Sequence, residues 1–169
     1  MKLALFDLDN TLLSGDSDFE WAQFLIAQGV LDREVYEARN LEFYAQYKAG
    51  TLNIHEFLAF SLRPLAEHPP EQLHAWREQF VERLIDPIIL PAARALVESH
   101  RARGDTPVII TATNRFVTAP IAARFGVEHL IATEVEMNGD RYSGRSTDIP
   151  CFQGGKVQRL RRWLELHRA

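Results

Sequence analysis

Two carboxylates stand two residues apart near the start of the chain, in the run FDLDNTL from Phe6 to Leu12. Because side chains alternate along an extended segment, Asp7 and Asp9 are expected to project to the same side. Carboxylates held this close repel each other unless a divalent cation lies between them or one stays protonated. Thr11 can hydrogen-bond locally and fix the turn. An Asp-rich turn without chemistry is the alternative, but the passage from an apolar strand directly into Asp-x-Asp-x-Thr-Leu favours a reactive or metal-binding site.

A second polar cluster, Thr111-Ala112-Thr113-Asn114, follows the apolar residues 108–110 and precedes a predicted helix. Hydroxyls and free backbone N–H groups at such a position can hold a phosphate group. Thr113 or Asn114 could instead cap the helix, and both interpretations hold together if Thr111 contacts the ligand.

A third cluster places Lys156 after Gly154-Gly155, at the start of the last predicted helix. The lysine ammonium suits a phosphoryl oxygen, and the glycines permit a close approach of the backbone. A single lysine is usually a solvated surface residue. The occurrence of all three clusters in this order is what predicts a phosphate site.

The spacing of apolar residues predicts the elements that must position these clusters. Predicted strands span residues 2–8, 107–110 and 129–133, a hairpin spans 134–149, and predicted helices span 18–28, 33–49, 54–66, 71–84, 92–103, 115–125 and 156–167. This order indicates an α/β fold, a doubly wound parallel sheet with an all-helical module inserted after the first strand. Ligands of such sheets bind beyond the carboxyl ends of the strands, so the polar residues that end each strand are expected to meet there.

Aromatic residues recur at three- and four-residue spacings in the helical insert. They include Tyr36, Phe43, Tyr44, Tyr47, Phe57, Phe60, Trp76 and Phe80. Such stripes are typical of a helix-bundle core, and we interpret them as core rather than as a cofactor site.

The composition is that of a globular domain. A chain of 169 residues with 46% apolar and 25% charged residues can bury one core. The net charge of −4 argues against a general nucleic-acid binder. No apolar run approaches a membrane span or a signal-peptide core, and the one cysteine, Cys151, allows no internal disulfide. We expect a cytoplasmic protein with no nucleic-acid or membrane partner.

The three clusters resemble the first three signature motifs of the haloacid dehalogenase (HAD) superfamily. The matching residues are 6–12, 110–113 and 154–157, and the resemblance covers the whole chain. The helical insert and the hairpin before residues 150–152 are similar to those of the phosphoserine phosphatase-like branch, subfamily IB, which includes histidinol-phosphate phosphatases. The resemblance implies a Mg²⁺-dependent phosphomonoester hydrolase.

Family membership would assign a role to each cluster. Asp7 would be the nucleophile that forms an aspartyl-phosphate, and Asp9 would protonate the leaving alkoxide and later deprotonate water. Thr111 and Lys156 would hold the phosphoryl oxygens. Mg²⁺ would bind the carboxylate of Asp7 and the backbone carbonyl of Asp9.

The resemblance implies a core of residues 1–15 and 87–169 and a helical cap of residues 16–86. The family's fourth motif, an acidic pair that completes the Mg²⁺ site at the end of a later strand, has no counterpart here. After Lys156 the only carboxylate side chain is that of Glu165. We therefore expect a core that lacks its C-terminal strands, a weakened Mg²⁺ site and an impaired or inactive phosphatase. The first strand would lie at an exposed sheet edge, which favours self-association.

The substrate is expected to be a small phosphomonoester with an amino group, of the histidinol-phosphate or phosphoserine type. The phosphoserine enzymes bind the amino group with a Glu nine residues after the nucleophile, and this chain has the shorter Asp16 there. Arg39 and Arg63 are candidates for the arginine of the cap. Three further residues are expected to bind the substrate or its phosphate: Thr11, Thr113 and Asn114.

Two alternatives come from other classes of protein. A non-catalytic HAD-fold fragment or interaction protein would retain the fold without the last metal carboxylate, and a metal titration would distinguish it from a phosphatase. A phosphorelay receiver also places acidic residues, a Thr and a Lys on a parallel sheet. It would carry its phosphorylated Asp after the third strand, where this chain has Glu134, and it has no helical insert. We reject the receiver.

Overall fold

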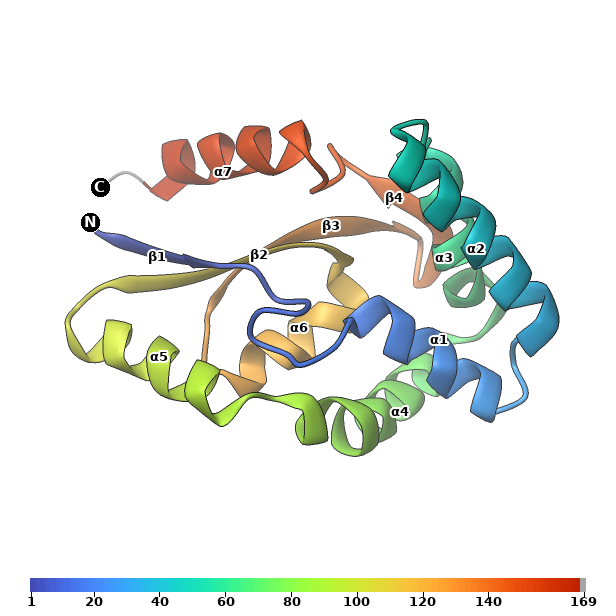
Figure 1. The fold of residues 1–169 in the computed structure, drawn as a ribbon, viewed down its shortest axis with the longest axis horizontal. Coiled ribbons are helices and arrows are strands. Elements are labelled where there is room, and N and C mark those ends of the chain that lie inside the picture. The colour runs from blue at the N-terminus through green and yellow to red at the C-terminus, as the bar shows by residue number, and fades with distance from the viewer. Residues whose placement is uncertain (168–169) are drawn as a thin grey trace.

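The structure, a computed structural model, describes residues 1–167, in which four strands form one sheet (Figure 1). The strands are β1 (Leu3–Phe6), β2 (Thr106–Asn114), β3 (His129–Asn138) and β4 (Arg141–Thr147). They are ordered β1-β2-β3-β4; β1 pairs with β2 and β2 with β3 in parallel, and β4 is antiparallel to β3. The expected α/β fold with a mostly parallel sheet is confirmed.

The strand register aligns the polar residues that follow the apolar strands. Phe6 pairs with Ile109, and Ile110 pairs with Ile131. The residues after Phe6 and those after Ile110 therefore lie near each other at the carboxyl end of the sheet.

Helices cover both faces of the sheet (Figure 1). Helices α5 (Pro91–Ala102) and α6 (Arg115–Arg124) lie on one face, and α7 (Gly154–His167) lies on the other. A small apolar cluster beneath α7 joins Val108, Ile131 and the buried Cys151 to Leu160 and Trp163. The larger core lies on the opposite face and extends into the helical insert.

Four helices form the insert between β1 and β2. They are α1 (Ser17–Ala27), α2 (Arg33–Ala49), α3 (Ile54–Glu67) and α4 (Pro70–Phe80). The side chains of Asp16, Asp32 and Asn53 accept backbone N–H groups at the starts of α1, α2 and α3, which satisfies otherwise unpaired donors. Helix α2 ends at Gly50, whose φ of 73° is the left-handed conformation that glycine adopts readily.

Aromatic contacts attach the insert to the core. The ring centroid of Trp21 lies 5.2 Å from that of Phe80 and 5.6 Å from that of Phe116, so α1 packs on both α4 and α6. Helices α2 and α3 meet through Phe43, whose ring centroid lies 5.5 Å from that of Phe57. Such edge-to-face pairs stabilise the contact beyond the apolar area they bury.

The hairpin of β3 and β4 also supports the insert. Gly144 of β4, with φ of 81°, lies against α3, where an added Cβ would come within 3.0 Å of the Ala66 Cβ. Helix α3 is therefore held by the sheet as well as by α2.

Several predicted boundaries are wrong by a few residues. Strand β1 ends at Phe6, and β2 and β3 extend further than expected, because Asn114 still pairs with Thr133 and the first hairpin strand continues β3. The helix expected over 71–84 is interrupted: after α4, a π-helical turn η1 (Val81–Ile85) and a 3₁₀ turn η2 (Asp86–Ile88) complete the segment. Pro87 within η2 has no N–H to donate to a carbonyl one turn earlier. Of the helices in residues 1–167, none has the length and apolar character needed to cross a membrane.

Candidate active site

Asp7 follows the end of β1 and is partly open to solvent. Its Oδ1 accepts the backbone N–H of Leu8 at 2.9 Å and lies 3.4 Å from the Nζ of Lys156, and half of its side-chain surface is exposed. Within residues 1–167, neither a hydrogen bond nor an ion pair involves Oδ2. Asp7 thus presents one oxygen that the protein does not use, beside a positive charge.

Asp9 is held by four donors. Its Oδ1 accepts the backbone N–H and the hydroxyl of Ser17, each at 2.6 Å. Its Oδ2 accepts the hydroxyls of Thr113 at 2.8 Å and Thr111 at 3.3 Å. The Thr111 hydroxyl in turn accepts the backbone N–H of Thr113 at 3.2 Å. The first cluster is therefore connected directly to the end of β2.

Asp7, Asp9, Thr111 and Lys156 line one cleft of about 670 Å³. Helices α2 and α3 form its opposite wall. The lining residues from the core side include Thr113, Asn114, Phe152 and Gln153, and those from the insert include Asp16, Asp18, Asn40, Phe43, Tyr44, Tyr47, Phe57 and Ser61. Three sequence clusters far apart in the chain thus meet in one space large enough for a small metabolite.

Of the other predicted site residues, some line the cleft and one does not. Asp16 and Asn114 line the cleft and also cap α1 and α6, because their side chains accept the N–H groups of Phe19 and Val117. Burial and the charge of the neighbouring Asp9 raise the pKa of Asp16. Thr11 is not among the residues that line the cleft; its side chain is exposed.

Two aromatic residues of the cleft wall were not predicted from the sequence. Tyr44 and Tyr47 of α2 are each 54% exposed and line the cleft, so the interpretation that they belong to a helix core is wrong. Phe43 and Phe80 are buried as expected. Aromatic residues on more than one face of α2 were the available signal, because one buried stripe accounts for only one face of a helix.

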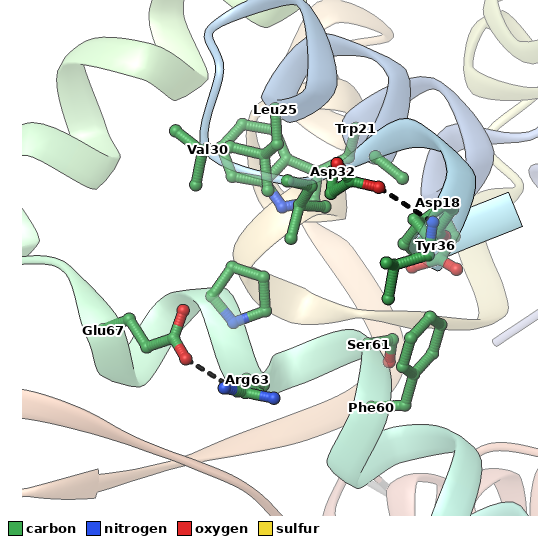
Figure 2. Close-up of a pocket in the computed structure, with 14 residues that line it drawn as sticks. Asp18, Trp21, Leu25, Val30, Asp32, Tyr36, Phe60, Ser61, Arg63 and Glu67 are labelled. Carbon is green, nitrogen blue, oxygen red and sulfur yellow. Dashed lines mark hydrogen bonds and ion pairs between the residues drawn. The ribbon is translucent and has the colours of Figure 1, made fainter. Parts of the chain in front are cut away.

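A second cavity of about 220 Å³ lies within the insert, between α1, α2 and α3 (Figure 2). Leu25 and Val30 lie toward one end of the view, and Asp18 and Tyr36 toward another. Asp18 and Ser61 line both this cavity and the cleft. Burial, together with the charges of nearby carboxylates, raises the pKa of Asp18 to about 7.

Lys156 is positioned by contacts at the start of α7. Gly155 packs so closely on the preceding loop that an added Cβ would overlap the carbonyl oxygen of Pro150. One turn further along, the buried Arg159 donates to the carbonyls of Ala132 at 2.9 Å and Ile149 at 3.0 Å. Helix α7 is therefore fixed to the sheet and to the loop after the hairpin, close to Lys156.

The oxygens at the end of β1 fit a Mg²⁺ ion in part. The free Oδ2 of Asp7 is a carboxylate ligand of the kind Mg²⁺ takes, and no backbone N–H outside the helices and strands donates to the carbonyl of Asp9 among residues 1–167. The Asp9 carboxylate is engaged by its four donors. In the described part of the chain, no group of three or more His, Cys, Asp or Glu side chains is arranged to hold a metal. Mg²⁺ commonly binds through one or two protein oxygens, with water and substrate phosphate as its other ligands, and this donor set is compatible with that mode.

The fold is that of a family of hydrolases, as the comparisons with known proteins show. A family model for the haloacid dehalogenase-like hydrolases matches residues 4–169, so the chain belongs to that family. It is 42% identical over 164 residues to a histidinol-phosphatase from Neisseria meningitidis serogroup C, covering 96% of this chain and 74% of that protein. It is 28% identical to a phosphoserine phosphatase from Mycobacterium tuberculosis, covering 94% of this chain and 52% of that protein.

Solved structures show the same architecture. A Bordetella pertussis protein of unknown function is 45% identical and superposes with a TM-score of 0.89, over 97% of this chain and 74% of that one. A substrate-bound phosphoserine phosphatase superposes with a TM-score of 0.67 over 98% of this chain and 71% of that one. At 19% identity, that second likeness supports the fold alone.

Proposed function

We propose that this chain is a Mg²⁺-dependent phosphomonoester hydrolase that acts through an aspartyl-phosphate on Asp7. The observation that carries the proposal is the convergence of Asp7, Asp9, Thr111 and Lys156 on one cleft, with the lysine Nζ 3.4 Å from the Asp7 Oδ1. We also propose that residues 1–15 and 87–169 form the catalytic core, that residues 16–86 form the cap, and that the protein is cytoplasmic.

The chemistry follows from the positions of these side chains. The carboxylate of Asp7 attacks phosphorus through one oxygen as the bond to the leaving oxygen breaks, and Asp9 gives that leaving oxygen a proton. In the second half, Asp9 takes a proton from water, whose oxygen attacks phosphorus and releases Asp7 and inorganic phosphate. Lys156 and the Thr111 hydroxyl hold the phosphoryl oxygens. The Asp7 carboxylate and the Asp9 carbonyl would hold a Mg²⁺ ion, which would supply positive charge to the phosphoryl oxygens.

The lining residues favour a substrate of the histidinol-phosphate type over phosphoserine. Among the described residues that line the cleft, Lys156 is the one lysine or arginine, so a substrate carboxylate would find no further cation there. Arg39 and Arg63 do not line the cleft: Arg39 pairs with Glu42 and Arg63 with Glu67, each at 2.6 Å. Histidinol phosphate has an ammonium and an imidazole but no carboxylate, and the name of the Neisseria relative supports the same choice.

The direct test is phosphate release from L-histidinol phosphate and from O-phosphoserine, with Mg²⁺ and with a chelator. We expect Mg²⁺-dependent release that is faster from histidinol phosphate, and a loss of at least about a hundredfold in Asp7→Asn. Asp140→Asn, on the exposed tip of the hairpin, is the matched control and should retain the rate. Mg²⁺-supplemented protein that releases phosphate from neither ester would overturn the proposal.

A non-catalytic role is the second candidate. It is favoured by the small donor set, one carboxylate and one carbonyl, that the described residues offer to a metal. Calorimetric titration with Mg²⁺ separates the two candidates: binding that is strengthened by inorganic phosphate supports the hydrolase, whereas the absence of binding at millimolar Mg²⁺ supports the non-catalytic role.

A further inference from the structure

The cleft holds more negative charge than the phosphoryl chemistry uses. Four carboxylates line it, those of Asp7, Asp9, Asp16 and Asp18. Asp7 and Asp9 carry out the reaction, and the carboxylate of Asp16 caps α1 by accepting the N–H of Phe19 at 2.9 Å. Asp18 has no comparable role, because within residues 1–167 its carboxylate takes part in neither a hydrogen bond nor an ion pair.

An unpaired carboxylate at this position is costly. Asp18 is partly buried as the second residue of α1, and the nearby Asp16 and Asp9 repel its charge; this burial and repulsion raise its pKa. A charge withdrawn from water without a partner destabilises the folded protein, unless a bound cation compensates for it. Unpaired carboxylates of this kind, in a cleft, are candidates for ligand recognition.

The position of Asp18 is also distinctive. Asp18 lines both the cleft and the second cavity, and so does Ser61 of α3. Figure 2 shows these two side chains at the second cavity. Arg63 and Glu67 line the second cavity and pair with each other, and Asp32 there caps α2. Of the charged residues around the second cavity, Asp18 is thus the one that borders the cleft and is left without a partner in the described chain.

We propose that Asp18 is a specificity-determining residue that receives the ammonium group of the substrate. The inference rests on the proposed function, because it assumes a phosphate ester bound at Asp7. Asp18 selects phosphate esters that carry a primary ammonium group, and Asp16 and Asp9 reinforce the negative potential there. Asp16 remains the helix cap, so the two acidic residues of the Asp16-Ser17-Asp18 segment have separate roles.

The test compares two ligands that differ only in the ammonium group: L-histidinol phosphate and its des-amino analogue. Their dissociation constants are measured by calorimetry at pH 8 in the Asp7→Asn background, which prevents turnover. In this background, with Asp18 intact, the protein should bind the amino ligand roughly tenfold or more tightly than the des-amino ligand, as expected for a hydrogen bond between charged groups. Asp18→Asn should reduce this preference to less than about threefold. Asp32→Asn makes the same chemical change at a residue that lines only the second cavity, and should keep the full preference.

Each outcome of this experiment supports or overturns the proposed role of Asp18. A preference that survives Asp18→Asn, or that Asp32→Asn removes equally, overturns the role of Asp18. If the protein with Asp7 intact hydrolyses phenyl phosphate but the cleft binds both ligands equally, the proposed function stands and this inference fails. If neither ligand binds and no phosphomonoester is hydrolysed, both fail. Thermal unfolding of each variant verifies that a changed preference comes from a folded protein.

Discussion

At the scale of single residues, Asp9 shows how the site is prepared for acid–base chemistry. Both of its oxygens accept hydrogen bonds, from Ser17 on one side and from Thr111 and Thr113 on the other. These partners fix its orientation before a substrate arrives. To exchange a proton with substrate or water, Asp9 must give up at least one of them, and the hydroxyl partners can rotate to allow this.

Thr113 is therefore expected to position Asp9 rather than to bind phosphate. Replacing it by the isosteric valine removes the 2.8 Å hydrogen bond and should lower kcat for histidinol phosphate about tenfold, with KM changed less than about threefold. Thr118→Val is the control, since that hydroxyl donates to the carbonyl of Asn114 and does not contact Asp9. A raised KM with an unchanged kcat would instead support direct phosphate binding by Thr113.

Asp18 should make the stability of the protein depend on pH. Its pKa is about 7 in the folded protein and near 4 in the unfolded chain, so between these values the unfolded chain releases a proton that the folded protein retains. The free energy of unfolding therefore falls as pH rises through this window, and the loss is complete above it. Asp18→Asn should raise the free energy of unfolding by about 2 kcal/mol at pH 8 and by much less at pH 4.5. Urea unfolding at both pH values measures this, and an equal effect at the two would contradict it.

The residues that could be predicted are those whose chemistry shows in local sequence. Asp7, Thr111 and Lys156 stand in motifs at strand ends and a helix start, which is why they could be placed together. Asp18 could not, because an acidic residue in the first turn of a helix is ordinarily a partner of the helix dipole. Its missing partner and its position between two cavities exist only in the folded chain.

At the scale of elements, the start of α7 depends on one glycine of a pair. Gly155→Ala would force its Cβ into the carbonyl oxygen of Pro150, so the loop and the first turn of α7 must shift and carry Lys156 with them. We expect a loss of about 2 kcal/mol or more in the free energy of unfolding and a lower kcat. Gly154→Ala is the matched control, because an added Cβ there meets no atom within 4 Å among the described residues. Circular dichroism melting curves of both variants provide the comparison; equal melting temperatures would refute the steric argument.

Element boundaries followed local signals where these were decisive. Asn53 caps α3 and Gly50 ends α2, as these residue types favour, and Asn138-Gly139 is typical of the turn in the predicted hairpin. The π-helical turn at Val81–Ile85 was not recognisable, because its sequence has no local signal that separates it from α4, and its Val81 and Ile85 are buried in the core. Tertiary packing determined the structure at that position.

At the scale of the whole molecule, β1 is an edge strand in the described chain, as expected. Leu5 on this strand is 46% exposed, so an apolar edge is open to another chain. We predict weak self-association that grows with concentration and is reduced by Leu5→Lys, since a charged edge disfavours strand pairing. Leu96→Lys, at a similarly exposed leucine of α5, should leave it unchanged. Sedimentation velocity over a range of concentrations is the measurement, and a monomer at every concentration would contradict the prediction.

The division into layers was predictable because an apolar strand, a helical insert and alternating helices and strands allow few arrangements. The composition of the cleft wall was not, since it depends on which face of α2 turns toward the core. Aromatic residues on more than one face of α2 indicate that some of them lie outside the core, but the packing of α2 on α3 decides that Tyr44 and Tyr47 are the ones that line the cleft.

The central claim is that Asp7 becomes phosphorylated during turnover, and trapping tests it most directly. The protein is mixed with Mg²⁺ and histidinol phosphate, quenched in acid during turnover, reduced with borohydride and digested for mass spectrometry. An aspartyl-phosphate at residue 7 is reduced to homoserine, so the peptide that contains residues 3–12 should carry homoserine in place of Asp7. Homoserine at Asp9 or at another acidic residue, or phosphate release that persists in Asp7→Asn, would contradict the account.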